Sequence, residues 1–361
     1  MIYLDYQATT PLAPEAREAM LRWLGGPEGD GFGNPHSPHR LGRMAEAAVE
    51  LAREQVAALF PAGGAVIFTA TATEAINLAM RGCEPGRAGD PIALTAIEHS
   101  AVERTAEDLP GEVFVLPVGG DGLVDPAEQV PRGTGLVCAM QVNNEIGTIQ
   151  PVADLQRTAR ENGALLLCDA VQAAGKMAIA EADMIAISAH KFHGPKGIGA
   201  LWVREGVGLA PLVTGGGQED GLRSGTLSPA LCAGFGAAAE LALGRMDEDA
   251  RHVAALWDRA REILAGWTLN GSATARYKGN LNLHREGIDV ARLMSDARTV
   301  CFSAGSACAS ESGKPSRVLG ALGLSPAQAR GSIRLGWGRY TTMGELEEGI
   351  GLILEAAALQ D

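Results

Sequence analysis

Short apolar segments alternate with polar and helical segments through the middle of the chain. Seven of them are bounded by turn-forming residues and are typical of buried strands. They span Ala65–Thr69, Ile92–Thr95, Val113–Leu116, Gly135–Met140, Leu165–Cys168, Met184–Ile187 and Gly199–Val203. Strands that alternate with helices in this way predict an α/β fold, in which a mostly parallel seven-stranded sheet lies between helices.

Helical segments are predicted before this sheet pattern. Pro14 is placed to begin a helix at Glu15, and Ser37-Pro38 is placed to cap an amphipathic helix. The apolar side of that second helix carries Leu41, Met44, Ala48, Leu51 and Leu59.

The character of the sequence changes after the glycines at 215–217. Ser228-Pro229 begins an alanine-rich helix, and a separate helix is predicted over Asp249–Ala265. Further predicted elements are strands at Asn280–His284, Val300–Ser303 and Ser332–Leu335, and a final helix at Glu345–Leu359 with a Thr342/Glu345 capping box. This mixture predicts a small α+β domain of residues 1–14 and 251–361, beside a large domain of residues 15–250.

Composition limits the classes of function. The 361 residues carry a formal net charge of -13, which argues against a nucleic-acid-binding surface. No apolar run is long enough to cross a membrane, and no signal-peptide pattern precedes the first predicted strand. The six cysteines form no Cys-x-x-Cys pair, and the seven histidines lack the spacing of metal ligands. We therefore expect a cytoplasmic protein without a disulfide framework or a metal site of its own.

Polar residues follow the predicted strands at the edge where α/β sheets bind ligands. Ala72 and Thr73 follow the first strand and begin a helix whose N–H groups could hold a phosphate. An ordinary threonine cap is the alternative. His99 follows the second strand, where it could cover a ligand or move a proton, or lie on a helix surface.

Amides and a carboxylate follow two later strands. Asn143 and Asn144 are poor core residues and good hydrogen-bonding groups. Asp169 ends a wholly apolar strand, and Gln172 lies three residues beyond it. A buried carboxylate needs a positively charged partner, which could be a pyridinium nitrogen, an arginine or a helix N-terminus.

Ser188, His190 and Lys191 follow the sixth strand, in a chain with only five lysines. A lysine kept in an apolar pocket loses its preference for the protonated form and can form a Schiff base. The alternative is a lysine that reaches solvent from the strand end. Because five strand ends of one sheet carry groups of this kind, the pattern favours a binding site.

A second chemical candidate lies in the segment Ser303–Lys314, which reads SAGSACASESGK. Cys308 is surrounded by glycine, serine and alanine, which cannot pack a core. The composition predicts an exposed thiol on a mobile loop, which could visit a site and react. An incidental loop cysteine is the alternative.

These residues lie in motifs that resemble the cysteine desulfurases of the NifS/IscS kind, in the class V aminotransferase group. The motifs are LDYQATTP, FGNPHSPHRLG, IFTATATEAIN, EHSAV, VNNEIG, CDAVQ, AHKFHGPKGIGALWV, GGGQEDGLRSGT, SAGSACAS and SIRLGWGRYTT. They span nearly the whole chain in the family's order. The resemblance implies fold type I of the enzymes that use pyridoxal 5'-phosphate (PLP) as cofactor.

The resemblance also implies a role for each matched residue. Lys191 would hold PLP as a Schiff base, with Asp169 on the pyridine nitrogen. His99 would stack on the ring and shuttle protons. Cys308 would be the nucleophile, and Arg334, together with Asn144, would bind the substrate carboxylate. The other cofactor contacts would come from Ala72 (through its backbone), Thr73, Asn144, Gln172, Ser188, His190 and, across a homodimer interface, Thr226.

The implied reaction converts L-cysteine to L-alanine and transfers the sulfur to Cys308 as a persulfide. The sulfur would pass to an acceptor protein for iron–sulfur cluster assembly or another sulfur-trafficking pathway. Cys308 could also transiently ligate an iron–sulfur cluster together with that partner. The alternative is a selenocysteine lyase, or another class V lyase or transaminase, that does not use Cys308. A sulfur-carrier module with a vestigial cofactor site is disfavoured, because Lys191 and Asp169 are intact.

The sequence departs from the family pattern in three places. Ala70-Thr71 replace the usual Ser-Gly of the phosphate turn, and His193 stands where tyrosine is common. The chain also ends at Asp361, soon after the final predicted helix. Housekeeping members use a C-terminal extension to dock a scaffold protein, so docking of that kind is not expected.

Overall fold

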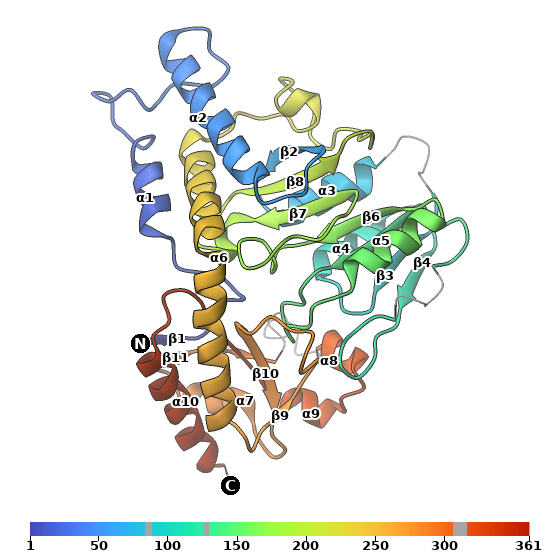
Figure 1. The fold of residues 1–361 in the computed structure, drawn as a ribbon, viewed down its shortest axis with the longest axis vertical. Helices are drawn as coiled ribbons and strands as arrows, with labels where there is room; N and C mark the ends of the chain where they lie inside the picture. Colours follow the sequence, from blue (N-terminus) through green and yellow to red (C-terminus); the bar gives the residue numbers. More distant parts are fainter. Residues whose placement is uncertain (84–88, 126–129, 306–315, 361) are drawn as a thin grey trace.

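The structure is a computed structural model that describes residues 1–83, 89–125, 130–305 and 316–360. Figure 1 shows a larger part built around one sheet and a smaller part that contains both chain ends, with one long helix running through both. Within the described ranges, no helix has the length and apolar character needed to cross a membrane.

A seven-stranded sheet forms the core of the larger part, and its strands match the seven predicted ones to within one residue at each end. In sheet order they are β2 (Gly64–Thr69), β8 (Gly199–Arg204), β7 (Met184–Ser188), β6 (Leu165–Asp169), β5 (Leu136–Met140), β3 (Ile92–Thr95) and β4 (Val113–Leu116). β8 is antiparallel to both of its neighbours, and every other pair in the sheet is parallel. The predicted α/β architecture is confirmed.

Helices cover both faces of this sheet, which is why its strands are almost wholly apolar. One layer consists of α3 (Ala72–Gly82) and α4 (Ser100–Asp108). The other layer consists of α1 (Pro14–Leu21), α2 (Arg40–Ala57), α5 (Val152–Glu161) and α6 (Pro229–Ile263). In β7, Met184 and Ala186 face the first layer, whereas Ile185 and Ile187 face the second. This alternation is the two-residue period of a strand between two apolar layers.

α2 buries a different face from the predicted one. Leu51 was expected on the apolar side, but it is 56% exposed. The buried residues are instead Gly42, Ala45, Val49, Ala52 and Val56. Small residues lie on this face because α2 packs closely against α6: a Cβ added at Gly236 of α6 would lie 2.9 Å from the Cα of Ala52. The N-cap is also different, since His39 accepts the Gly42 N–H and Ser37 lies two residues before it.

One helix, α6, replaces the two helices predicted between Ser228 and Ala265. Ser228 caps it as expected, and the helix then continues for 35 residues to Ile263. No glycine or proline interrupts its second half, and charged residues there form pairs along the surface, such as Arg245 with Glu248 at 2.8 Å. α6 therefore joins the two parts of the molecule (Figure 1). Residue 250 lies inside this helix, and the division of the chain into two domains stays a prediction.

The smaller part is built on a four-stranded antiparallel sheet. Its order is β12 (Ser303–Ala304), β13 (Ser332–Gly336), β10 (Asn280–His284) and β9 (Thr268–Leu269). The first strand of the chain, β1 (Ile2–Tyr3), pairs in parallel with β11 (Val300–Cys301) and so brings the N-terminus into this part. The helices here are α7 (Val290–Asp296), α8 (Arg317–Ala321), α9 (Pro326–Arg330) and α10 (Met343–Ala358). α10 begins with the predicted Thr342/Glu345 capping box.

Candidate active site

A cavity of about 280 Å³ lies where the carboxyl ends of the parallel strands meet the smaller part. Ten residues predicted for the site line it: Ala72, Thr73, His99, Asn144, Asp169, Gln172, Ser188, His190, Lys191 and Arg334. Nine of them follow or end strands of the large sheet, and Arg334 lies on β13 of the small sheet. The structure therefore brings these residues to one place.

Lys191 lies in the turn that directly follows β7, and its amine is held by the backbone of the N-terminal segment. Nζ donates hydrogen bonds to the carbonyl oxygens of Gln7, at 2.7 Å, and Ala8, at 2.8 Å. The side chain is partly buried. The amine is therefore positioned at the cavity by a part of the chain far away in sequence, which the strand pattern did not predict.

The neighbouring His190 is neutral at physiological pH. Burial, together with the positive charge of Lys191, lowers the pKa of its imidazole to about 4. Its Nδ1 lies 3.1 Å from Thr9 Oγ1. A neutral imidazole still carries one N–H, so it can donate a hydrogen bond to an anion without adding a buried charge.

Asp169 ends β6 and is buried. Burial raises the pKa of its carboxyl, and the positive charges of His99 and Lys191 oppose that rise. Its Oδ1 accepts the Val171 N–H at 3.0 Å. A buried carboxylate is stabilised by positive charge, and a protonated pyridine nitrogen in the cavity would supply it.

His99 is the N-cap of α4, and its role toward a ligand stays a prediction. Its Nδ1 accepts the Ala101 N–H at 3.1 Å. This bond places the proton of the neutral ring on Nε2. Nε2 is therefore a donor, and the ring lies on the cavity wall.

The turn after β2 combines a threonine cap with a possible phosphate site. Thr71 caps α3 by accepting the Glu74 N–H at 3.2 Å. The N–H groups of Ala72 and Thr73 belong to the first turn, where a helix stabilises an anion. The two interpretations of the sequence are thus compatible, because the cap uses a different residue from the predicted phosphate contacts.

A buried glutamate that the sequence analysis missed precedes His99. Glu98 Oε1 accepts hydrogen bonds from Thr95 Oγ1, at 2.5 Å, and from the Met140 N–H, at 2.8 Å. It therefore links the ends of β3 and β5 behind the cavity. Burial raises the pKa of this carboxyl to about 7, and the neighbouring charge of Asp169 adds to the rise. The sequence signal was an acidic residue within four positions of an apolar strand end.

Arg334 is held by an acidic partner that was also missed. It is 1% exposed, and its Nη2 donates to Asp5 Oδ1 at 2.7 Å and to Ser303 Oγ at 3.1 Å. Its Nη1 donates to the backbone oxygen of Asn144 at 3.2 Å. Asp5 lies in the first quoted motif, LDYQATTP. Its position beside an apolar strand was the available signal, because a carboxylate that is partly buried there needs a positively charged partner.

Gln172 connects the cavity wall to the N-terminal segment. Its Nε2 donates to the Gln7 oxygen at 3.0 Å, and its Oε1 accepts from Lys176 Nζ at 3.0 Å. Gln7 therefore receives hydrogen bonds from both Gln172 and Lys191. Neither Gln7 nor Lys176 was given a role from the sequence. The contact between Gln7 and Gln172 crosses 165 positions, whereas Lys176 lies only four positions beyond Gln172.

One described residue among those predicted for the site, Thr226, does not line the cavity. Thr226 is exposed, and its predicted contact across a homodimer interface stays a prediction. Cys308 lies outside the described residues. Among the described cysteines, Cys138, Cys168 and Cys232 are free and buried, and Cys301 is free and half-buried. In the described part of the chain, no group of three or more histidine, cysteine or acidic side chains could hold a metal ion.

Comparisons with known proteins agree with this geometry. The sequence matches the aminotransferase class-V family over residues 2–348. The chain belongs to this family. It is 41% identical to the cysteine desulfurase IscS of Rickettsia bellii (strain OSU 85-389), over 98% of this chain and 90% of the relative.

Solved structures of related proteins share the whole fold. A NifS-like protein superposes with a TM-score of 0.89 at 32% identity, over 99% of both chains. The structure of SspA in complex with cysteine superposes with a TM-score of 0.82 at 32% identity, over 95% of this chain and 100% of the other. The chain is a PLP-dependent enzyme with the fold of the NifS-like proteins.

The residues at the cavity fit this cofactor. Lys191 offers an amine, Asp169 offers a buried carboxylate, and the first turn of α3 offers N–H groups for a phosphate. The replacement of Ser-Gly by Ala70-Thr71 leaves this turn intact. Ala70 contributes its N–H to Glu74 Oε2 at 2.7 Å, and Thr71 provides the cap.

Proposed function

We propose that the protein is a cysteine desulfurase that converts L-cysteine to L-alanine and transfers the sulfur to Cys308. The observation that carries this proposal is the grouping of Lys191, Asp169, His99 and Arg334 around one cavity. Together they offer an amine for the cofactor, a partner for its ring, a proton donor and a carboxylate clamp. The related SspA was solved with bound cysteine, and the related IscS proteins are cysteine desulfurases.

The cofactor would be held at both ends. Lys191 would bind it covalently, and Asp169 would lie against the ring nitrogen, with Gln172 and Asn144 beside the ring hydroxyl. The phosphate would lie on the first turn of α3, contacted by Ala72, Thr73, Ser188 and His190. When bound, PLP supplies an electron sink that makes the α-proton of an amino acid acidic.

Arg334 would orient the substrate carboxylate. Its guanidinium is nearly completely buried, and Asp5 balances its charge when no substrate is present. The hydrogen bonds that the guanidinium donates to Asp5, Ser303 and the Asn144 carbonyl fix its plane. A fixed guanidinium plane favours two parallel hydrogen bonds to a carboxylate, which selects amino acids and sets their orientation.

His99 would hold and deliver a proton at Nε2. The hydrogen bond from the Ala101 N–H to Nδ1 fixes this tautomer and the ring orientation. A proton at this position can pass to a group in the cavity and return to the ring, which is the general acid–base role expected of the residue.

The sulfur transfer would use Cys308, on the segment between Gly305 and Ser316. Both flanking residues are anchored by hydrogen bonds: Asn282 Nδ2 donates to the Gly305 oxygen at 3.0 Å, and Ser316 Oγ donates to Glu145 Oε2 at 2.6 Å. The Cys308 thiolate attacks the substrate sulfur, so an S–S bond forms and the bond from sulfur to the β-carbon breaks. The β-carbon keeps the electron pair and takes a proton, which gives alanine and a persulfide.

The test is to add L-cysteine and a reductant to PLP-loaded protein and to quantify alanine and sulfide together. Equal amounts of both products are expected, and both are expected to be lost in Cys308→Ser but kept in the control Cys301→Ser. Alanine formation that survives in Cys308→Ser would favour the alternative, a selenocysteine lyase or another class V enzyme that does not use this cysteine. Pyruvate and ammonia in place of alanine would indicate an eliminating lyase.

We propose further that the enzyme is a homodimer with Thr226 in the partner's site. Large apolar side chains are exposed at the end of the molecule that carries α1 and α2 (Figure 1), namely Leu21, Leu24, Phe32 and Leu51. Light scattering should give a molar mass of twice the chain mass. Leu51→Glu should lower this measured mass towards that of one chain. A protein that is monomeric at micromolar concentration would refute this.

The sulfur acceptor would be a cytoplasmic protein, such as an iron–sulfur scaffold. A cytoplasmic location is expected because the Cys308 thiol must stay reduced. Transfer of labelled sulfur from the persulfide to a candidate scaffold would identify the acceptor. If the labelled sulfur stays on the enzyme in the presence of that scaffold, and only added reductant releases it, the scaffold is not the acceptor.

A further inference from the structure

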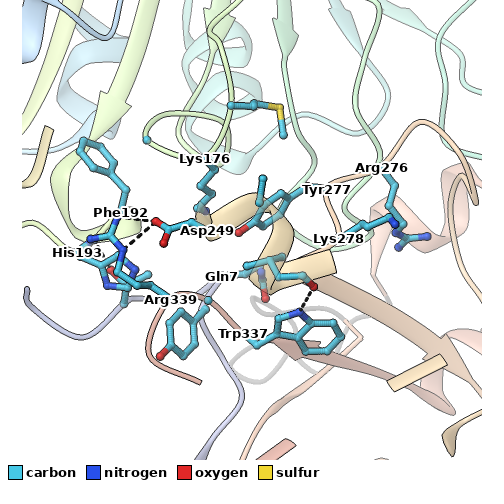
Figure 2. Close-up of a pocket in the computed structure, with 17 residues that line it drawn as sticks. Gln7, Lys176, Phe192, His193, Asp249, Arg276, Tyr277, Lys278, Trp337 and Arg339 are labelled. Carbon is cyan, nitrogen blue, oxygen red and sulfur yellow. Dashed lines mark hydrogen bonds and ion pairs between the residues drawn. The ribbon is translucent and has the colours of Figure 1, made fainter. Parts of the chain in front are cut away.

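A second cavity lies between the two parts of the molecule (Figure 2), and it shares Gln7 in its lining with the active-site cavity. Its volume is about 280 Å³, the same as that of the active-site cavity. The larger part contributes Lys176 and Phe192, and the smaller part contributes Tyr277 and Trp337. The cavity can thus hold a small organic molecule, and none of the roles described above uses it.

Positive charge dominates the wall of this cavity, although the whole chain has a net charge of -13. Four basic residues line it, Lys176, Arg276, Lys278 and Arg339, against one acidic residue, Asp249. Asp249 is already paired, with its Oδ2 2.6 Å from Arg339 Nη2 (Figure 2). Lys278 is half-exposed and lies 3.8 Å from Asp258. Within the described part of the chain, Lys176 and Arg276 have no carboxylate partner.

Lys176 is half-buried in the cavity wall. Its only described hydrogen bond is the one to Gln172 Oε1, and its Nζ lies 5.2 Å from the centre of the Tyr277 ring. Burial, together with the charge of Lys191, lowers the pKa of this amine to about 7. A lysine in this condition lacks the negative partner that would keep it charged.

Arg276, like Lys176, has no carboxylate partner among the described residues, and it is buried. It is 6% exposed, and its guanidinium donates only to backbone oxygens, those of Ser272, Ile146 and Asn270. Its Nε has no hydrogen-bond partner. A buried and a half-buried positive charge at one cavity, neither with a carboxylate partner, are unfavourable without an anion, and a bound anion would offset that cost.

The rest of the wall favours a planar apolar body. Four of the chain's 16 phenylalanine, tryptophan and tyrosine residues line the cavity: Tyr6, Phe192, Tyr277 and Trp337. We propose that this cavity is a second ligand site, which binds a small aromatic carboxylate with its charged group on Lys176 and its ring among the aromatic side chains. The long-range charge of Arg276 adds to the attraction.

The site is connected to the active site by a short chain of hydrogen bonds. Lys176 donates to Gln172, Gln172 donates to the Gln7 oxygen, and Lys191 donates to that same oxygen. A bound carboxylate keeps Lys176 charged and so strengthens its hold on Gln172. The ligand would therefore change the environment of Lys191 without entering its cavity, a consequence that rests on the proposed function.

The test is calorimetric titration of PLP-loaded protein with benzoate, with benzamide as the neutral probe of the same shape. One benzoate should bind per chain, and benzamide should bind about tenfold or more weakly because it lacks the charge. Lys176→Met should weaken benzoate binding by about tenfold or more, while the exposed control Lys196→Met should leave it unchanged. Arg334→Lys should also keep this binding.

Contrary results are equally specific. Binding that is lost in Arg334→Lys and kept in Lys176→Met would place benzoate in the active site and overturn the proposal. Equal affinity for benzoate and benzamide, or no heat at all, would do the same. If Lys176→Met fails to fold, a crystal of the unaltered holoenzyme soaked with 4-iodobenzoate decides the question: iodine density between Tyr277 and Trp337 supports the site, and its absence there refutes it.

Discussion

Replacing Glu98 with glutamine should change how the stability of this protein depends on pH. The carboxyl is buried, and its pKa rises from 4.5 in the unfolded chain to about 7 in the folded protein. The folded protein therefore holds this proton more tightly than the unfolded chain does. The stability that Glu98 contributes is fully present below pH 4.5 and is lost as the pH rises through 7.

The size of the effect follows from the two pKa values. The rise from 4.5 to about 7 corresponds to roughly 3 kcal/mol, at about 1.36 kcal/mol for each pKa unit. About 2.5 kcal/mol of this is lost between pH 5 and pH 8. Glutamine keeps an oxygen to accept from Thr95 and Met140 but does not ionise. The glutamine protein should therefore gain about 2.5 kcal/mol relative to the unaltered protein over that interval.

Urea unfolding at pH 5 and pH 8, followed by circular dichroism at equal PLP occupancy, measures this difference. Effects of pH on the rest of the protein cancel between the two proteins. Glu161→Gln, at an exposed position, serves as the control and should show no such change. If the free-energy difference between the glutamine protein and the unaltered one is the same at both pH values, Glu98 is ionised in the folded protein and the reasoning is wrong.

Three further substitutions test contacts that position the fold and the site. Asp5→Asn should destabilise the protein by about 3 kcal/mol, since it leaves buried Arg334 unpaired, and should raise KM for L-cysteine more than it lowers kcat; unchanged kinetics and unfolding would exclude this ion pair. Gly175→Ala should cost about 3 kcal/mol in urea unfolding, because φ is +69° and the new Cβ would lie 2.8 Å from Phe192 Cβ. Gly163→Ala is the control, because its φ is +72° but no atom lies within 4 Å of the added Cβ, and it should cost only about 1 kcal/mol. If the two alanine substitutions lower stability equally, the contact with Phe192 does not contribute. Thr342→Ala should lower stability by about 1 kcal/mol through loss of the α10 cap, and Thr342→Ser should restore it.

The sequence by itself determined the large sheet and most of the candidate site. A parallel strand between two helical layers is apolar on both faces, so each strand appears as a continuous apolar run whose ends are visible in the sequence. Residues that follow such runs must gather at one edge of the sheet, which is why Asp169, Ser188 and Lys191 could be named together. The quoted motifs then indicated the family and its cofactor.

Which face a helix buries was decided only by the tertiary structure. Successive helical residues differ in direction by about 100°, so a choice one residue away selects another face. In α2 the larger apolar residues suggested the Leu51 side, whereas the close approach of α6 requires a small residue at Ala52. The backbone of the preceding loop, at Ser37 and Asn34, leaves no room for a side chain at Gly42. The continuity of α6 was likewise decided by the two cores that its halves contact.

Contacts between segments that are distant along the chain could not be predicted from the sequence either. Asp5 meets Arg334 across 329 positions, and Lys191 meets the Gln7 carbonyl across 184. The second cavity combines Lys176 with Tyr277 and Trp337, which belong to separate parts of the fold. A local pattern reports what one segment buries, but the partner of a buried charge depends on which segments the completed fold places together.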